Sequence, residues 1–230
     1  MENIKQLSEQ LLLAMKKQES SLALSNQLAN FPMKVLKDQL STDTHKKAFW
    51  INCYNAYYLI LRKELNISKE KIYKEEAIQI AGEKFSLDDI EHGILRKYRH
   101  KLSLGYLPNV FAKALIKELA VEKLDYRIHF ALNCGAKSCP PIAFYSSERL
   151  EAQLEMATLS FLESETQFDT DKNEIRLSKI FQWFRADFGG KDGIREIHYV
   201  RLKIPIEGQK IIYNDYDWSD DLDNFSEETF

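Results

Sequence analysis

Cysteine is scarce in this sequence, with only Cys53, Cys134 and Cys139 among 230 residues. An odd number this small cannot cross-link a chain of this length, which excludes a disulfide-stabilised scaffold. Glycine and proline are few as well, with 8 and 5 residues, so a collagen-like or low-complexity chain is also excluded. The three cysteines are therefore expected to be reduced thiols.

Neither sign of charge is in large excess, because 32 lysines and arginines face 35 aspartates and glutamates and leave a net charge of -3. The basic footprint of a nucleic-acid-binding protein is missing, and no polybasic cluster points to a membrane surface. We therefore expect a small molecule or a peptide as ligand, and no nucleic acid. The oligomeric state is left open by the sequence.

Long apolar runs are absent. The longest one, residues 49–61, is interrupted by Asn52 and Asn55 and is shorter than the roughly 20 residues that span a bilayer. Residues 1–15 have no basic leader and no small-residue cleavage site, so we see no signal peptide. The expectation is a cytoplasmic protein without a membrane span, or an exported one if the sequence has been trimmed.

The residues that are present, 44% hydrophobic and 29% charged, are typical of a globular protein with one substantial core. Hydrophobic periodicity and turn signals predict a helix-rich α+β single domain with a small, mostly antiparallel sheet. A fold like that of cysteine peptidases or transglutaminases is an expectation that comes from the candidate Cys-His site described below. We expect an N-terminal helical segment (1–40), a main domain (41–219) and an acidic tail (220–230) that frays.

Helical spacing or capping signals recur in several segments, and short apolar runs mark strands. Helices are expected over residues 1–30, 45–65, 86–98, 109–118, 146–164, 179–188 and 192–199, and strands over 127–132, 174–177 and 211–213.

The segment RIHFALNCGAKSCPPI, residues 127–142, is the most informative for chemistry. It predicts a strand that leads into a loop with Cys134 and Cys139 near its ends. Cys134 is the better nucleophile, because Gly135 lets a substrate approach closely and backbone N–H groups of such a turn can stabilise an oxyanion. His129 is the nearest base in sequence.

Strand geometry argues against His129 as the base for Cys134. Side chains alternate along a strand, so His129 and Asn133 would share one face while Cys134 lies on the other. His92, beside Glu91 on a helix that Ser86 caps, is the alternative base. The choice between the two histidines stays open at this point.

Asn52 and Asn55 lie one turn apart on an otherwise apolar helix. A buried amide without partners costs on the order of 1–3 kcal/mol, so each should be hydrogen-bonded. One hypothesis is that either amide orients a catalytic imidazole, as in Cys-His-Asn hydrolases. The other is that both tie neighbouring loops to the helix, with Cys53 packing between them.

Each of these features also fits a purely structural role. Cys134, Cys139 and His129 also fit a buried polar cluster, since free cysteine often packs as a small hydrophobe. A disulfide between the two cysteines is conceivable, and a zinc site is not favoured because the usual ligand spacings are missing. We expect no cofactor and no metal. The aromatic stretch 177–190 is expected to be core, with Arg185 pairing with Asp187.

Five segments together resemble the family catalogued as domain of unknown function 547. They are FWINCYNAYYL (49–59), SLDDIEHGILR (86–96), RIHFALNCGAKSCPP (127–141), LSKIFQWFRADFG (177–189) and YDWS (216–219). The family pattern falls on residues that the argument from chemistry also selects, together with two more, Trp50 and Pro140. The shared residues are Asn52, Asn55, Glu91, His92, His129, Asn133, Cys134 and Cys139. The resemblance implies that relatives include bacterial proteins, some of them exported, and plant proteins in which coiled-coil segments precede the domain.

Two functions follow as expectations. The first is a thiol-dependent hydrolase or acyl transferase in which Cys134 attacks an acyl or amide carbonyl, with His129 or His92 as base. The residues nominated as catalytic are Cys134, His129, His92, Asn52 and Asn55, with Glu91, Asn133, Gly135 and Cys139 in binding or supporting roles. The second is a non-catalytic binding or scaffolding domain in which the same residues form a buried polar network.

Overall fold

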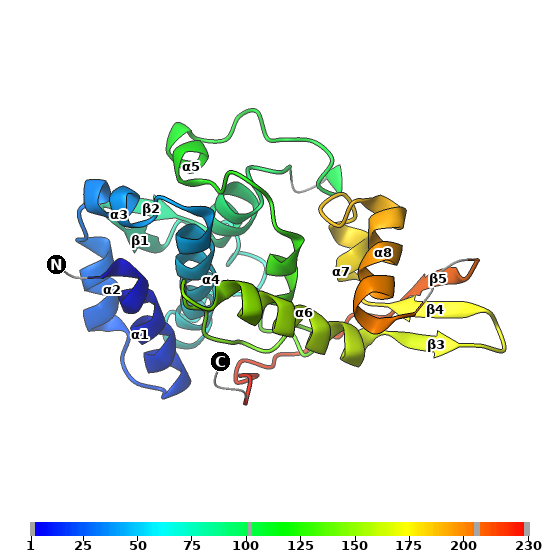
Figure 1. The fold of residues 1–230 in the computed structure, drawn as a ribbon. Helices are drawn as coiled ribbons and strands as arrows, with labels where there is room; N and C mark the ends of the chain where they lie inside the picture. Colours follow the sequence, from blue (N-terminus) through cyan, green and yellow to red (C-terminus); the bar gives the residue numbers. More distant parts are fainter. Residues whose placement is uncertain (1–2, 101–102, 205–207, 228–230) are drawn as a thin grey trace.

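The computed structural model describes residues 3–100, 103–204 and 208–227 and shows the expected helix-rich α+β architecture (Figure 1). The α-helices are α1 (Ile4–Lys16), α2 (Leu22–Ala29), α3 (Met33–Gln39), α4 (Asp43–Leu59), α5 (Ala114–Leu119), α6 (Leu150–Glu165), α7 (Ile180–Trp183) and α8 (Gly190–Leu202). The described residues also form two π-helices, η1 (Ile60–Glu64) and η2 (Asp89–Leu95), and a 3₁₀-helix, η4 (Tyr126–Phe130).

Helix α4 forms the centre of the larger hydrophobic cluster. Its N-terminus is capped by Thr42, whose side chain accepts a hydrogen bond from the His45 N–H. Every residue from 47 to 59 is buried, because α1 packs along one side and η2 along another. The sequence prediction of a helix buried on several sides is therefore confirmed.

The strands form two small sheets. Strands β1 (Ile78–Ile80) and β2 (Glu83–Phe85) make an antiparallel hairpin. Strand β4 (Glu174–Leu177) pairs antiparallel with β3 (Gln167–Asp169) and parallel with β5 (Lys210–Tyr213). The strands predicted at 174–177 and 211–213 are thus present in one sheet.

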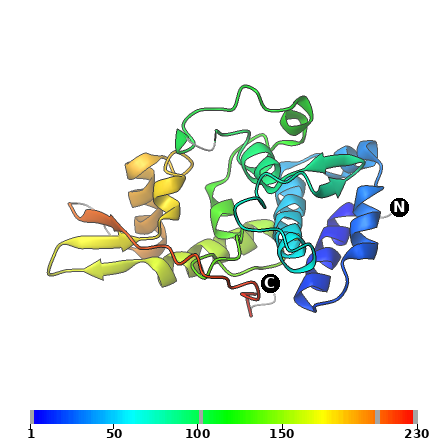
Figure 2. The same ribbon diagram turned by 180° about the vertical axis from the view of Figure 1, so that it is seen from behind.

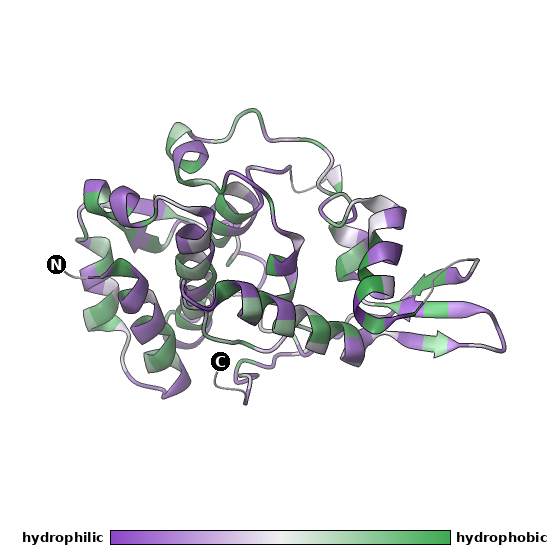
Figure 3. Cartoon of the chain, in the orientation of Figure 1, coloured by the Kyte–Doolittle hydropathy of each residue, from purple (hydrophilic) through white to green (hydrophobic). Residues whose placement is uncertain are grey.

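The hydrophobic core has two parts. The larger cluster surrounds α1 and α4, and the smaller one joins the second half of α6 to β4, α7 and α8. Figure 3 shows hydrophobic residues in both parts of the chain, and Figures 1 and 2 show them next to each other. The η4 segment contributes to both, because Ile128 packs in the larger cluster and Phe130 in the smaller one.

The strand predicted over residues 127–132 is wrong. Residues 126–130 form the 3₁₀-helix η4, which is capped by Asp125 and packs against α6. A short apolar run is compatible with a strand or with a buried helical turn, and here the Asp125 cap and the packing favour the turn. The alternation that separated His129 from Cys134 therefore does not apply.

The C-terminal strap, residues 214–226, continues from β5 as the red segment in Figure 2 and reaches the cysteine loop, residues 133–140. It was expected to fray from residue 220 on, but Asp220 and Asp223 form ion pairs with Arg62 and Lys63 at 2.9 and 2.6 Å. Its backbone also pairs with the loop, for example from the Lys137 N–H to the Ser219 carbonyl. Residues 228–230 of the predicted tail lie outside the described residues.

Candidate active site

A cavity of about 210 Å³ opens between the two hydrophobic clusters. Fifteen residues line it: Tyr54, Tyr73, Asp88, Glu91, His92, His129, Leu132, Cys134, Cys139, Pro140, Ile180, Trp183, Phe184, Tyr216 and Trp218. They come from α4, η2, η4, the cysteine loop, α7 and the strap or from residues next to these elements, and Tyr73 comes from the turn before β1. A cavity that joins several elements and holds both apolar walls and titratable groups is the usual form of a ligand site.

The cysteine loop, residues 133–140, is held in shape by Asn133. Its side-chain oxygen accepts from the Gly135 N–H at 2.6 Å, and its amide nitrogen donates to the Pro140 carbonyl at 2.7 Å. Gly135 has φ +68°, and an added Cβ would run into the Tyr58 ring, so glycine is required there. Both ends of the loop are therefore fixed by a buried amide.

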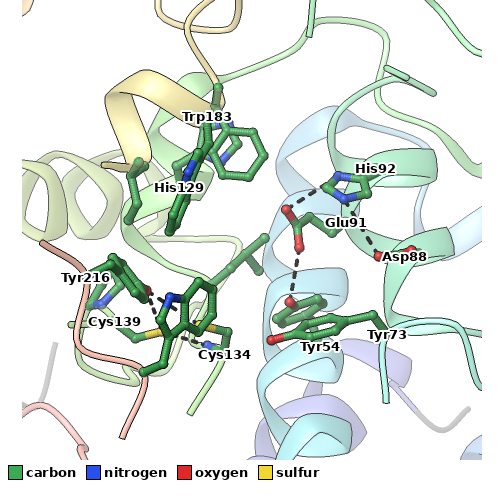
Figure 4. A pocket seen from close by; sticks show the side chains of 15 residues that line it. Tyr54, Tyr73, Asp88, Glu91, His92, His129, Cys134, Cys139, Trp183 and Tyr216 are labelled. Atoms are coloured by element: carbon green, nitrogen blue, oxygen red, sulfur yellow. Dashed lines mark hydrogen bonds and ion pairs between the residues drawn. The ribbon is translucent and has the colours of Figure 1, made fainter. Parts of the chain in front are cut away.

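The two thiols of this loop share a hydroxyl group. Tyr216 Oη lies 3.5 Å from Cys134 Sγ and 3.1 Å from Cys139 Sγ. The backbone N–H of Cys134 also donates to Cys139 Sγ at 3.1 Å. Figure 4 shows this group at the lower edge of the cavity, below His129.

The two sulfurs differ in acidity. A hydrogen bond from the Cys139 thiol, helped by the Tyr216 hydroxyl and opposed by burial, lowers the pKa of Cys134 to about 7. Burial raises the pKa of Cys139 well above its usual value. Cys134 is partly exposed whereas Cys139 is buried, so the more exposed cysteine is also the one that carries a thiolate near neutral pH.

His129 is held by a buried carboxylate that sequence reasoning placed elsewhere. Its Nε2 lies 2.8 Å from Asp187 Oδ2, and the same oxygen accepts from Arg96 Nε at 2.6 Å. The imidazole stacks on the Phe184 ring at 4.0 Å. The predicted pairing of Asp187 with Arg185 is wrong, because Asp187 points inward to these two partners.

The charges of this group fix the tautomer of His129. Burial favours a neutral carboxyl at Asp187, but hydrogen bonds from His129 and Arg96 outweigh it and lower its pKa. Burial, together with the Arg96 charge, lowers the pKa of His129 although Asp187 opposes the shift, so the ring is neutral near pH 7. Nε2 then carries the proton that binds Asp187, and Nδ1 keeps its lone pair.

The Nδ1 atom of His129 has no hydrogen-bond partner among the described residues, although its side chain is only 2% exposed. Because the ring lines the cavity, this nitrogen is available to a ligand there. A neutral imidazole held by a carboxylate, with its second nitrogen open, has the arrangement of a general base.

The opposite wall is formed by η2. Ser86 and Asp89 form the predicted capping box, with hydrogen bonds of 3.0 and 3.1 Å in the two directions. The chain then continues as a π-helix, in which the Arg96 N–H donates to the Glu91 carbonyl. Such wider turns are frequent at functional sites, and this one brings Glu91 and His92 to the cavity.

Arg96 also fixes the hydrogen bonding of the His92 ring. Its Nη1 lies 2.8 Å from His92 Nδ1, and a guanidinium only donates, so Nδ1 of His92 is an acceptor. Burial by itself would raise the pKa of Glu91, but its neighbours, among them the Arg96 guanidinium and the Tyr54 hydroxyl, outweigh burial and lower the pKa. Glu91 is thus an ionised carboxylate that accepts from the Tyr54 hydroxyl at 3.1 Å.

The structure separates the nominated residues into two groups. Cys134, Cys139, His129, His92 and Glu91 line one cavity. No histidine nitrogen within the described ranges is hydrogen-bonded to the Cys134 sulfur, whose partners are Cys139, Tyr216 and the backbone N–H of Ala136.

The buried asparagines are occupied by backbone groups. Asn52 binds the N–H and C=O of Tyr145, and Asn55 binds the Ala131 carbonyl and the Asn133 N–H. Neither amide contacts an imidazole in the described part of the chain, so the hypothesis that one of them orients a catalytic histidine is wrong. The hypothesis that they tie loops to α4 is confirmed.

The oxyanion site expected in the cysteine turn is not formed. The N–H groups of Cys134 and Gly135 already donate, to Cys139 Sγ and to Asn133 Oδ1. A carbonyl oxygen of a ligand cannot use these donors without breaking the loop. The other donors at the Cys134 sulfur are the Tyr216 hydroxyl and the backbone N–H of Ala136.

Sequence reasoning missed four contributors, Asp187, Arg96, Tyr54 and Tyr216. A signal existed for Asp187, because it lies in a segment that carries the family resemblance, as does Tyr216. Nothing local indicated their partners, which lie 58 residues from Asp187 at His129 and 82 residues from Tyr216 at Cys134.

No three histidine, cysteine, aspartate or glutamate side chains are placed to hold one metal ion within the portion that the structure describes. In that same portion, no helix has the length and apolar character needed to traverse a lipid bilayer.

Comparison with known proteins adds one finding. The sequence profile of the family described as protein of unknown function, DUF547, matches residues 38–162, which is more than half of the chain. No curated protein and no solved structure matches. The matched range contains α4, η2 and the cysteine loop, whereas Asp187 and Tyr216 lie beyond it.

Proposed function

The chain belongs to the DUF547 family, and from its site we propose that it is a thiol-dependent hydrolase or acyl transferase. Cys134 is the nucleophile, His129 the general base and acid, and Asp187 the positioning residue for His129. The observation that carries the proposal is one cavity lined both by an acidic, accessible thiol and by an imidazole whose Nδ1 is open.

His129 is preferred to His92 because of their hydrogen bonds. Nδ1 of His92 is occupied by the Arg96 guanidinium, and its Nε2 lies 3.7 Å from Asp88. His129 instead keeps Nδ1 without a partner in the described chain, while Asp187 fixes Nε2. Hydrogen bonds to a nucleophile are often long before a substrate binds, so a direct bond between His129 and Cys134 is not required in the free protein.

The reaction balances with these groups. His129 Nδ1 receives the Cys134 proton, and the thiolate attacks the carbonyl carbon, which forms a C–S bond while the carbonyl π electrons move to oxygen. Tyr216 donates to that oxygen. When the intermediate collapses, the bond to the leaving amine or alkoxide breaks and the leaving group takes the proton from His129.

The resulting thioester is released by water or by an acceptor amine. His129 takes the proton of the attacking group, a C–O or C–N bond forms, the C–S bond breaks, and the proton returns to the Cys134 sulfur. The cavity favours a substrate with an apolar body, because Trp183, Phe184 and Trp218 form much of its wall.

A binding or scaffolding domain is the second candidate. It is favoured by the three asparagines, Asn52, Asn55 and Asn133, whose amides bind backbone groups only. These residues hold the cysteine loop to α4 whether or not catalysis occurs. This candidate predicts a folded protein that binds a ligand in the cavity without turning it over.

The test combines thiol titration with acylation. Reduced protein is exposed to iodoacetamide across pH, and to a panel of aryl esters and aminocoumarin amides, with the covalent product located by peptide mapping. We expect selective alkylation of Cys134 with a midpoint near pH 7 and a thioester at the same residue. His129→Gln, whose amide nitrogen can still donate to Asp187, should slow acylation about 100-fold.

Cys53→Ser is the matched control, because Cys53 is buried in α4 and should leave every rate unchanged. Turnover that survives Cys134→Ser contradicts the proposal. A Cys134 that alkylates with an ordinary midpoint near 8.5 and never acylates favours the scaffolding candidate.

A further inference from the structure

The two sulfurs of the cysteine loop lie side by side at the edge of the cavity (Figure 4). Tyr216 Oη is within 3.5 Å of Cys134 Sγ and 3.1 Å of Cys139 Sγ. We propose that Cys134 and Cys139 form a reversible disulfide, in which Cys134 reacts first with a peroxide and Cys139 resolves the product. This is a redox modification site in addition to any acyl chemistry.

The loop already holds the two thiols in hydrogen-bond contact. A tight turn, closed by the Cys139 N–H and the Ala136 carbonyl at 2.9 Å, brings the two cysteines together. The Cys134 N–H points at Cys139 Sγ, so this sulfur lies against the backbone of the other cysteine. Joining the sulfurs requires side-chain rotation within one loop and no separation of the hydrophobic clusters.

The two thiols differ in exposure and in pKa, as a reactive cysteine and a resolving cysteine must. Cys134 is partly exposed to the cavity, whereas Cys139 is 6% exposed. Hydrogen bonds favour the thiolate at Cys134, while burial keeps Cys139 protonated. Oxidation follows thiolate character and access, and a resolving cysteine beside the reactive one is typical of redox-sensitive sites.

Each step balances. The Cys134 thiolate attacks the peroxide, an S–O bond forms and the O–O bond breaks, and the released hydroxide (or alkoxide, from an organic hydroperoxide) takes a proton and leaves as water (or an alcohol). Cys134 is oxidised by two electrons to a sulfenic acid. Cys139 sulfur then attacks it, the S–S bond forms, the S–O bond breaks, and the Cys139 proton leaves with the hydroxide as water.

A small dithiol restores the pair by two exchange steps and is itself oxidised to a disulfide. If the proposed hydrolase function holds, the disulfide removes its nucleophile and the site works only when reduced. That consequence rests on the proposed function, whereas the disulfide itself does not.

The experiment treats the full-length reduced protein with hydrogen peroxide, then alkylates it under denaturing conditions and maps the peptides by mass spectrometry. We expect a cross-linked peptide that joins Cys134 to Cys139 and has lost two hydrogens, while Cys53 stays alkylatable. Dithiothreitol should restore the free thiols. In Cys139→Ser, the cross-link should vanish and a sulfenic acid at Cys134 should be trapped by dimedone.

Cys53→Ser is again the control and should behave as the unmodified chain does. The proposal is overturned if Cys134 goes on to sulfinic acid while Cys139 remains alkylatable, or if Cys139 is oxidised first. Because the readout is the mass of a peptide and no substrate is added, this failure is distinct from a failure of the hydrolase test, which uses reduced protein.

Discussion

Two buried polar networks meet near the cavity, and they are built differently. In the asparagine network, Asn52, Asn55 and Asn133 bind backbone N–H and C=O groups. In the imidazole chain, His129 binds Asp187, Asp187 binds Arg96, and every link joins two side chains.

The two networks differ in the polar atoms that they leave without a hydrogen-bond partner. The amides of Asn52 and Asn55 bind one backbone donor and one backbone acceptor each. The imidazole chain instead leaves His129 Nδ1, Asp187 Oδ1 and Arg96 Nη2 without a partner among the described residues. Backbone-bound amides fix loops, whereas a charged chain with open ends costs stability and is typical of a site that binds or reacts.

Breaking the imidazole chain should have the largest effect on stability. Asp187→Ala leaves the Arg96 guanidinium buried and without its ion pair, so we expect a loss of about 3–5 kcal/mol in the free energy of unfolding. Urea denaturation measures it. Asp187→Asn, which keeps a hydrogen-bond acceptor, should lose less, and a loss below about 1 kcal/mol for Asp187→Ala would show that the pair is not structurally important.

Breaking the asparagine network should cost less and leave the thiol unchanged. Asn52→Ala abandons the N–H and C=O of Tyr145 in the core, so we expect a loss of about 2–3 kcal/mol. The midpoint of Cys134 alkylation should stay near pH 7, because Asn52 does not contact the cysteine loop. A shifted midpoint would mean that the two networks are coupled.

The smallest effect on stability is expected when the hydroxyl of Tyr216, which links the strap to the two thiols, is removed. Tyr216→Phe removes a donor to Cys134, so its pKa should rise from about 7 and alkylation at neutral pH should slow several-fold. The rate should still increase with pH, since the thiolate is the reactive form. Unfolding should change by roughly 0.5–1.5 kcal/mol.

Tyr213→Phe is the matched control for that variant. Tyr213 is also a tyrosine near the strap, but its hydroxyl has no hydrogen-bond partner in the described chain. An equal slowing of alkylation in both variants would contradict the role assigned to Tyr216.

Much of the local structure followed from the sequence. The helix across residues 45–65, the Ser86 capping box and the strand at 174–177 were predicted, because periodicity and caps are properties of neighbouring residues. The strand at 127–132 was not present, since packing against α6 and the Asp125 cap decided its conformation. The position of the strap depends on ion pairs of Asp220 with Arg62 and of Asp223 with Lys63, and no local pattern reveals pairs between residues so far apart in the sequence.

The sequence by itself determined which residue types were available for chemistry, including Cys134, Cys139, His129, His92 and Glu91, and these five do line one cavity. Only the tertiary structure decided their roles. It joined His129 to Asp187 and Cys134 to Tyr216, and it gave the asparagines to the backbone. The physical reason is that protonation and reactivity depend on burial and on hydrogen-bond partners, and these partners come from segments far apart in the chain.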